Sequence, residues 1–196
     1  MLTVETDPVA VEERLGSGRL ACPGCSGVLA RWGHARGRRV RDIDGGLWIT
    51  PRRARCTGCG ATHVLLPVVL LLRRADSAAV IGAGLTAKAT GAGHRLIAAA
   101  LDRPPETVRG WLRRFSARVE AVRAVFTRWC RDLAPDPVLP GPAGSAWADA
   151  LAAILAAAQA MGARFVLGEV PVWQAASAVS GAWLLAPGWP VPAGRC

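Results

Sequence analysis

The amino-acid sequence predicts an α+β fold in which a small β-rich module with four cysteines is followed by helices. Two C-x2-C pairs bracket thirty residues in which apolar and polar residues alternate, a pattern typical of short strands. From residue 76 onward, apolar residues instead recur every three or four positions, which is the period of helices. Residues 145–196 are rich in alanine and nearly free of charge, which adds an Ala-rich C-terminal helix to the expected fold.

The chain has 196 residues, which is room for one or two small domains. Changes in composition and in hydrophobic period indicate where the parts begin and end. The expected division is an N-terminal arm at 1–19, a cysteine ribbon at 20–72, a helical domain at 73–133, a Pro/Gly linker at 134–144 and an Ala-rich helical region at 145–196.

Positive charge is concentrated in the first two thirds of the chain. The formal net charge is +10; residues 1–133 carry 22 basic against 11 acidic side chains, and the remainder carries 2 against 3. All the basic residues except Lys88 are arginine, whose planar fork grips phosphate or guanine with two hydrogen bonds. A GC-rich coding bias would explain arginine in place of lysine, but it would not explain the uneven distribution. We therefore expect a polyanionic partner.

Neither a signal peptide nor a membrane span is expected. The opening stretch MLTVETDPVAVEERLG is acidic and has no continuous apolar core. The longest aliphatic run, Val64–Leu72, is far shorter than a membrane span of about 20 residues and is interrupted by Pro67. We expect a soluble, cytoplasmic and nucleoid-associated protein, in which cysteine thiols stay reduced.

The four cysteines follow the pattern C-x2-C-x30-C-x2-C, with Cys22, Cys25, Cys56 and Cys59. Two such knuckles can present four thiolates tetrahedrally to Zn(II). A disulfide does not suit a reducing compartment, and a thioredoxin-like redox motif needs only one pair in a βαβ context. Glycines in and after the knuckles suit the tight turns. The sequence therefore predicts a zinc ribbon that holds one Zn(II) per chain.

Three strands are expected between the knuckles, at 28–32, 38–43 and 47–50, with a turn at 44–46. So small a sheet buries little apolar surface, and the metal should supply much of its folding free energy. His34 and His63 lie near the knuckles, but four thiolates already complete the site. We expect both histidines to be polar surface residues.

Three helices should follow the ribbon. Asp76 can cap a helix over 77–89, which Gly82 and Gly84 weaken, and a second helix covers 94–101. After a short turn, Pro105 suits the first position of a third helix. Its outward side should carry small and basic residues, namely Thr107, Arg109, Gly110, Arg113 and Arg114. This pattern predicts a helix-turn-helix with its second helix in the major groove, or else an ordinary αα-hairpin.

A resemblance to a known family covers residues 20–118. CPGC, the arginine-rich hairpin, PRRARCTGCGATHVLLP and GAGHRLIAAALDRPPETVRGWLRRF resemble the N-terminal DNA-binding portion of insertion-sequence transposases, in which a zinc ribbon precedes a helix-turn-helix. They also resemble short actinobacterial proteins of unknown function built from the same modules. In the transposases, a ribonuclease-H-like domain with three metal-binding carboxylates follows. The resemblance stops before that domain.

The C-terminal sequence has a seven-residue period rather than a carboxylate cluster. One apolar seam runs from Val108 to Leu133, which predicts an extended recognition helix, and a second runs from Trp147 to Phe165. The Pro/Gly linker would let the second helix fold back as an antiparallel partner, or either seam could pair with its copy in a homodimer. The tail after residue 170 predicts either a short helix around 174–185 or a peptide that orders on a partner.

The expected function is zinc-dependent binding of double-stranded DNA without catalysis, because the acidic residues beyond Leu133 are too few for two-metal chemistry. The expected DNA contacts are Arg36, Arg38, Arg39, Arg41, Arg52, Arg53, Thr107, Arg109, Arg113 and Arg114. One hypothesis is a transposase-like accessory or remnant that works with a separately encoded recombinase. The others are a transcriptional regulator that dimerises through its C-terminal helices, and a structural or RNA-binding zinc ribbon.

Overall fold

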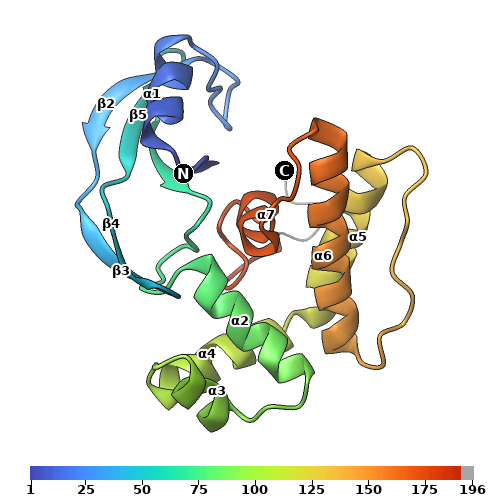
Figure 1. Cartoon of the computed structure of the whole chain (residues 1–196). Coiled ribbons are helices and arrows are strands. Elements are labelled where there is room, and N and C mark those ends of the chain that lie inside the picture. Colours follow the sequence, from blue (N-terminus) through green and yellow to red (C-terminus); the bar gives the residue numbers. More distant parts are fainter. Residues whose placement is uncertain (191–196) are drawn as a thin grey trace.

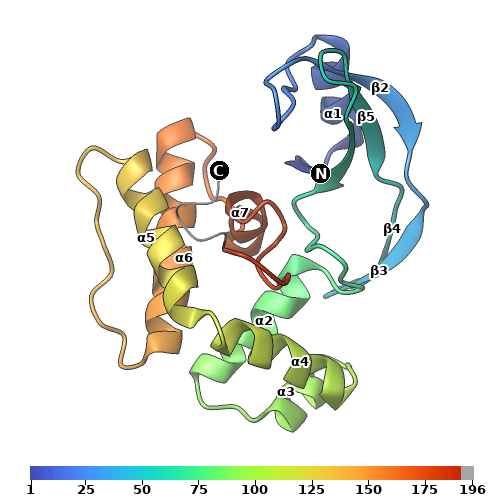
Figure 2. The ribbon, with the colours of Figure 1, turned by 180° about the vertical axis from the view of Figure 1, so that it is seen from behind.

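The computed structural model describes residues 1–190. They form a β-rich half and a helical half, with the short helix at residues 172–179 between them (Figures 1 and 2). The strands are β1 (Leu2–Val4), β2 (Leu29–His34), β3 (Arg38–Asp42), β4 (Gly45–Ile49), β5 (Arg52–Cys56) and β6 (Thr62–Pro67). The helices are α1 (Pro8–Gly16), α2 (Ala78–Ala89), α3 (His94–Ala100), α4 (Pro105–Ser116), α5 (Val119–Leu133), α6 (Ala146–Phe165) and α7 (Val172–Val179). The fold is mixed α+β, as the sequence predicts.

The β-rich half contains a four-stranded sheet in the order β1-β6-β5-β2 and a separate β3-β4 hairpin. The β1 strand pairs with β6 in parallel, and the other pairings are antiparallel. One face of the sheet packs against α1, where Val11 and Leu15 join Leu29 and Leu65 in a buried cluster. Residues expected to form an N-terminal arm thus supply a strand and a helix to the sheet.

The strands expected between the knuckles exist with no end moved by more than two residues. Sequence analysis did not anticipate β5 and β6, which carry the second knuckle. The β3-β4 hairpin extends the β2-β5 ladder, because the Ala35 N–H donates to the Pro51 carbonyl at 2.8 Å between the two pairs of strands. Figure 1 shows the result as one long bent ribbon that reaches from α1 to the start of α2.

The first three helices of the second half share one core. Ile81 and Leu85 of α2, Ile97 of α3, and Trp111 and Phe115 of α4 are all buried in it. The turn between α3 and α4 is short, and Pro105 is the first residue of α4, where its missing N–H costs no hydrogen bond. Leu96 of α3 points away from this core and is 68% exposed.

The extended helix expected from residue 105 to 133 is broken in the structure. The α4 helix ends at Ser116 and α5 begins at Val119. At the break, Arg118 has φ −138° and ψ 12°, which is outside helical geometry. The break redirects the chain, so that Phe115 at the end of α4 packs against Trp147 of α6, with ring centroids 4.7 Å apart. A seven-residue seam predicts this apolar face correctly but not the change of direction within it.

The α5 and α6 helices pack side by side and run parallel, which differs from the antiparallel pair that was one of the two expected alternatives (Figures 1 and 2). The linker at 134–144 runs back along the whole pair. Its eleven residues can extend to about 36 Å, whereas the 15 residues of α5 rise only about 22 Å. The length of the linker therefore permits α6 to run either parallel or antiparallel to α5.

The contact face of α6 is narrower than its predicted seam. Ala150, Ala153 and Ala157 are buried, while Phe165, placed in the seam, is 54% exposed. Of the helices that the structure describes, α6 has the length and composition that would suffice to cross a membrane. Its alanine face is buried against α5, and 33% of its most apolar stretch is buried in this fold.

The α7 helix and the turns after it lie between the two halves (Figure 1). Ser177 Oγ donates to the Leu70 carbonyl at 2.7 Å, and the Leu72 N–H donates to the Ala182 carbonyl at 2.8 Å. Trp173 packs directly over Gly82 of α2. The tail therefore folds onto its own chain as far as the structure describes it, and Cys196 lies outside the described residues.

Candidate metal centre and basic surface

The two knuckles bring four cysteine sulfurs together at one end of the sheet. The Sγ atoms of Cys22, Cys25, Cys56 and Cys59 lie within 4.8 Å of one another. Two pairs are closer: Cys25 to Cys56 at 3.4 Å and Cys22 to Cys59 at 3.9 Å. Four sulfurs bound tetrahedrally at about 2.3 Å from one metal ion would lie about 3.8 Å apart. The cluster fits a closed four-coordinate site.

Tight turns hold these sulfurs in place. The N–H groups of Gly58 and Cys59 donate to Cys56 Sγ at 3.3 and 3.4 Å. Gly60 ends the second knuckle with φ +74°, a conformation that favours glycine. At Gly27, a Cβ would approach Cys56 Sγ to 3.0 Å, so a larger residue there would crowd the sulfur. The glycines beside the knuckles thus serve both the turn and the space around the metal site.

The thiols are poised unequally for deprotonation. The Cys59 N–H lowers the pKa of Cys56 to about 6; hydrogen bonds with Cys25 and the Gly58 N–H act in the same direction, and burial opposes them. The pKa of Cys25 is raised to about 11: a hydrogen bond with Gly27 lowers it, but the neighbouring sulfurs and desolvation raise it more. Four thiols this close cannot all ionise without a cation, and a divalent metal would supply that charge.

His63 corrects one expectation of the sequence. Expected at the surface, it is only 9% exposed on β6, and its Nε2 lies 3.4 Å from Cys22 Sγ. Burial, and then the amino-terminal ammonium, lowers the pKa of His63 below 6.5, so the neutral ring is favoured beside the sulfur. His63 therefore supports the four-sulfur set from outside. His34 is exposed, as expected.

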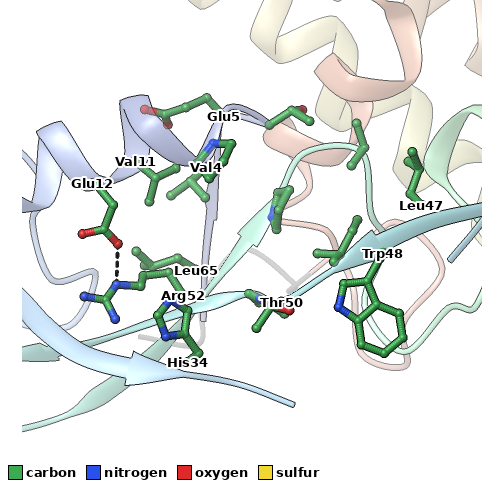
Figure 3. Close-up of a pocket in the computed structure, with 16 residues that line it drawn as sticks. Val4, Glu5, Val11, Glu12, His34, Leu47, Trp48, Thr50, Arg52 and Leu65 are labelled. Carbon is green, nitrogen blue, oxygen red and sulfur yellow. Dashed lines mark ion pairs between the residues drawn. The ribbon is translucent and has the colours of Figure 1, made fainter. Parts of the chain in front are cut away.

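Two of the ribbon arginines form ion pairs with α1 on the face of the sheet that α1 covers. Glu12 of α1 pairs with both Arg31 and Arg52, and Arg52 Nη1 also donates to the Gly33 carbonyl at 2.8 Å. Figure 3 shows the Glu12–Arg52 pair at one end of a mainly apolar cavity of about 360 Å³ between α1, β1, β6 and β4. Arg52, an expected DNA contact, thus helps to fasten α1 to the sheet.

Asp76 joins the two halves of the molecule. Its carboxylate accepts from Arg103 Nε at 2.6 Å and from Arg41 Nη2 at 2.7 Å. The expected cap of α2 is therefore not Asp76: Ser77 is the N-cap, and its Oγ accepts from the Val80 N–H at 3.1 Å. Arg41 was an expected DNA contact, but in the structure its guanidinium forms an ion pair with Asp76.

The remaining ribbon arginines are not used in this way. In the part of the chain that the structure describes, Arg36, Arg38, Arg39, Arg53 and Arg55 take part in no ion pair. Arg39 borders a hollow of about 650 Å³ whose other wall is the α3-α4 turn with Asp102 and Arg103. The tip of the basic hairpin and the α3-α4 turn therefore face the same hollow.

The arginines of α4 differ in their exposure and in the groups that they contact. Arg113 is exposed and makes no ion pair in the described chain, whereas Arg109 pairs with Glu106 at 3.0 Å on the surface. Arg114 Nη1 donates to the Gly110 carbonyl at 2.9 Å, and Thr107 is half-buried. Of the four α4 residues expected to touch DNA, Arg113 is the most available.

Sequence reasoning missed Arg103, the buried partner of Asp76, because nothing near it in the chain signals a pairing across 27 residues. The burial of His63 could have been suspected from its place directly before the continuous apolar run Val64–Leu66. Comparisons with protein-family models, with curated proteins and with solved structures find no match for this chain.

Proposed function

We propose that Cys22, Cys25, Cys56 and Cys59 hold one Zn(II) per chain and that the protein binds double-stranded DNA. Four thiolates fill a tetrahedral zinc shell and leave no position open for water or substrate. The metal would therefore stabilise the ribbon rather than perform catalysis. The four-sulfur geometry, with its S···S distances of 3.4 and 3.9 Å, supports the metal half of this proposal.

Metal analysis of protein purified without chelator tests the site. We expect one zinc per chain, lost on Cys56→Ser because three thiolates bind zinc far more weakly. Cys130→Ala is the matched control, since Cys130 is a buried cysteine of α5 remote from the cluster, and this variant should keep its zinc. Protein that contains no zinc, or that keeps it in Cys56→Ser, would refute the site.

The DNA half of the proposal rests on one observation: Arg39, which forms no ion pair within the described residues, and the α3-α4 turn border the same hollow. In a helix-turn-helix, the turn and the first turns of the second helix lie at the DNA. A duplex that took α4 in its major groove would then pass close to the hairpin arginines. Arg113 would reach base edges, while Arg38 and Arg39 would contact phosphates.

Within this proposal, the chain is a transposase-like accessory protein that recognises element ends beside a separately encoded recombinase. The alternative of a transcriptional regulator depended on C-terminal helices that dimerise. In the structure, the apolar face of α5 is covered by α6 of the same chain, which makes that alternative less attractive.

Fluorescence anisotropy with labelled duplexes, after selection of the preferred site from random DNA, tests which arginines contact bases and which contact phosphates. Arg113→Ala should weaken binding to the preferred site by about 1–3 kcal/mol and change binding to random DNA little. Arg38→Ala and Arg39→Ala should weaken both equally and lower the salt slope by about one unit. Arg128→Ala on α5 is the control and should change neither. Equal losses for Arg113→Ala on both duplexes would contradict base readout by α4.

A further inference from the structure

An exposed tryptophan on the ribbon has geometry that the duplex proposal does not use. Trp32 of β2 is 52% exposed. The β2-β5 register shifts at this point: Arg31 pairs with Ala54 and Gly33 pairs with Arg53, which leaves Trp32 as the extra residue. A β-bulge of this kind turns a side chain away from the regular alternation and often lies at functional sites.

The bulge places Trp32 beside arginines that form no ion pair with any residue among 1–190. The guanidinium carbon of Arg55 lies 4.8 Å from the centroid of the Trp32 ring, within range of a cation–π interaction. Arg53 and Arg55 alternate along β5 and so share a face of the sheet. That face is the one opposite Arg52 and Glu12. An exposed aromatic ring, the exposed Arg55 and the half-buried Arg53 are thus grouped on one face of the sheet, where Arg55 Nε also donates to the Gly60 carbonyl at 3.2 Å.

This surface is hollowed next to the metal centre. Trp32, Arg55 and the second knuckle, residues 56–60, line a hollow of about 690 Å³. With zinc bound, four thiolates carry net negative charge, which disfavours a phosphate on the knuckle side. The uncharged, aromatic base of a nucleotide can lie on that side, and the phosphates that flank the base can contact the arginines.

We propose that Trp32 is a stacking platform for an unpaired nucleobase, so that the ribbon also binds single-stranded nucleic acid. Bases in an intact duplex are already stacked and paired, and a base must leave the helix before it can lie on an exposed indole. Stacking on aromatic side chains with arginines along the backbone is the physical basis of sequence-tolerant single-strand binding. This inference extends the proposed nucleic-acid function to a second substrate form, and it does not require α4.

The test measures binding of the zinc-loaded full chain to labelled oligothymidylate of about 12 nucleotides and to a duplex, by anisotropy. Trp32→Ala should weaken oligothymidylate binding by about 5- to 150-fold, which corresponds to the usual 1–3 kcal/mol of base stacking. Trp32→Phe should retain most of the affinity, and duplex binding should change less than about twofold. Trp183→Ala is the control, because Trp183 is also exposed but lies outside the ribbon.

An unchanged oligothymidylate affinity in Trp32→Ala, or an equal loss on both nucleic acids, would overturn the inference. The outcomes for the two proposals remain separable. Single-strand binding that depends on Trp32 without any duplex binding would support the stacking platform and refute the duplex function. Duplex binding with no Trp32 effect on the single strand would do the reverse. Zinc content and circular dichroism of each variant show that the ribbon is folded.

Discussion

Two glycines two residues apart in α2 should respond in opposite ways to the same substitution. Both weaken the helix, because glycine is less favourable than alanine in a helix interior by about 1 kcal/mol. At Gly84, a Cβ would meet its nearest neighbour, Leu101 Cδ1, at an ordinary 3.4 Å. Gly84→Ala should therefore raise the free energy of unfolding by about 0.5–1 kcal/mol.

At Gly82, the same methyl group would overlap the indole ring of Trp173, far inside the contact distance of about 3.5–4.0 Å between carbons. The indole cannot move alone, because its helix is anchored by the hydrogen bond from Ser177 to Leu70. Overpacking of this kind costs about 1–3 kcal/mol, which exceeds the propensity gain. Gly82→Ala should lower the free energy of unfolding by about 1–2 kcal/mol.

Urea denaturation followed by far-ultraviolet circular dichroism measures both changes without relying on tryptophan fluorescence. A double-mutant cycle isolates the cause: in a Trp173→Ala background, Gly82→Ala should cost nothing, since its methyl group then has space. Equal responses of Gly82→Ala and Gly84→Ala, or a cost at Gly82 that persists without the indole, would show that α7 does not dock on α2 as described.

Two further predictions concern the joint and the metal. Asp76 and Arg103 are 3% and 9% exposed. Arg103→Met should cost about 1.5–3 kcal/mol in urea denaturation, because the buried carboxylate loses one of its two charged partners and keeps only Arg41. Arg123→Ala, which breaks a surface pair with Glu120, should cost under about 1 kcal/mol, and similar costs would contradict the joint. Removal of the metal by a chelator should unfold the ribbon and leave the helices, because their core lacks the cysteine ligands; loss of most helical dichroism would contradict two separate cores.

The four-cysteine cluster was largely predictable from the sequence because its determinants are local. Each C-x2-C pair forms its own turn, and the glycines that shape the second knuckle lie within four residues of Cys56. The start of α4 was predictable in the same way, because Pro105 at its first position is a local backbone signal. Only the support from His63 depended on which neighbour covered it.

The direction in which elements pack was decided by the tertiary structure alone. A seam of apolar residues shows which side of α5 is buried, but a parallel and an antiparallel α6 would bury that same side. The partner of Asp76 is also non-local, because a carboxylate beside a serine has the composition of a helix cap until Arg41 and Arg103 approach it from 35 and 27 residues away. Gly82 has the same dependence: sequence shows a weak helix position, and only the approach of Trp173 shows why no side chain fits there. Backbone preferences act between neighbours in the chain, whereas steric fit and ion pairing act between neighbours in space.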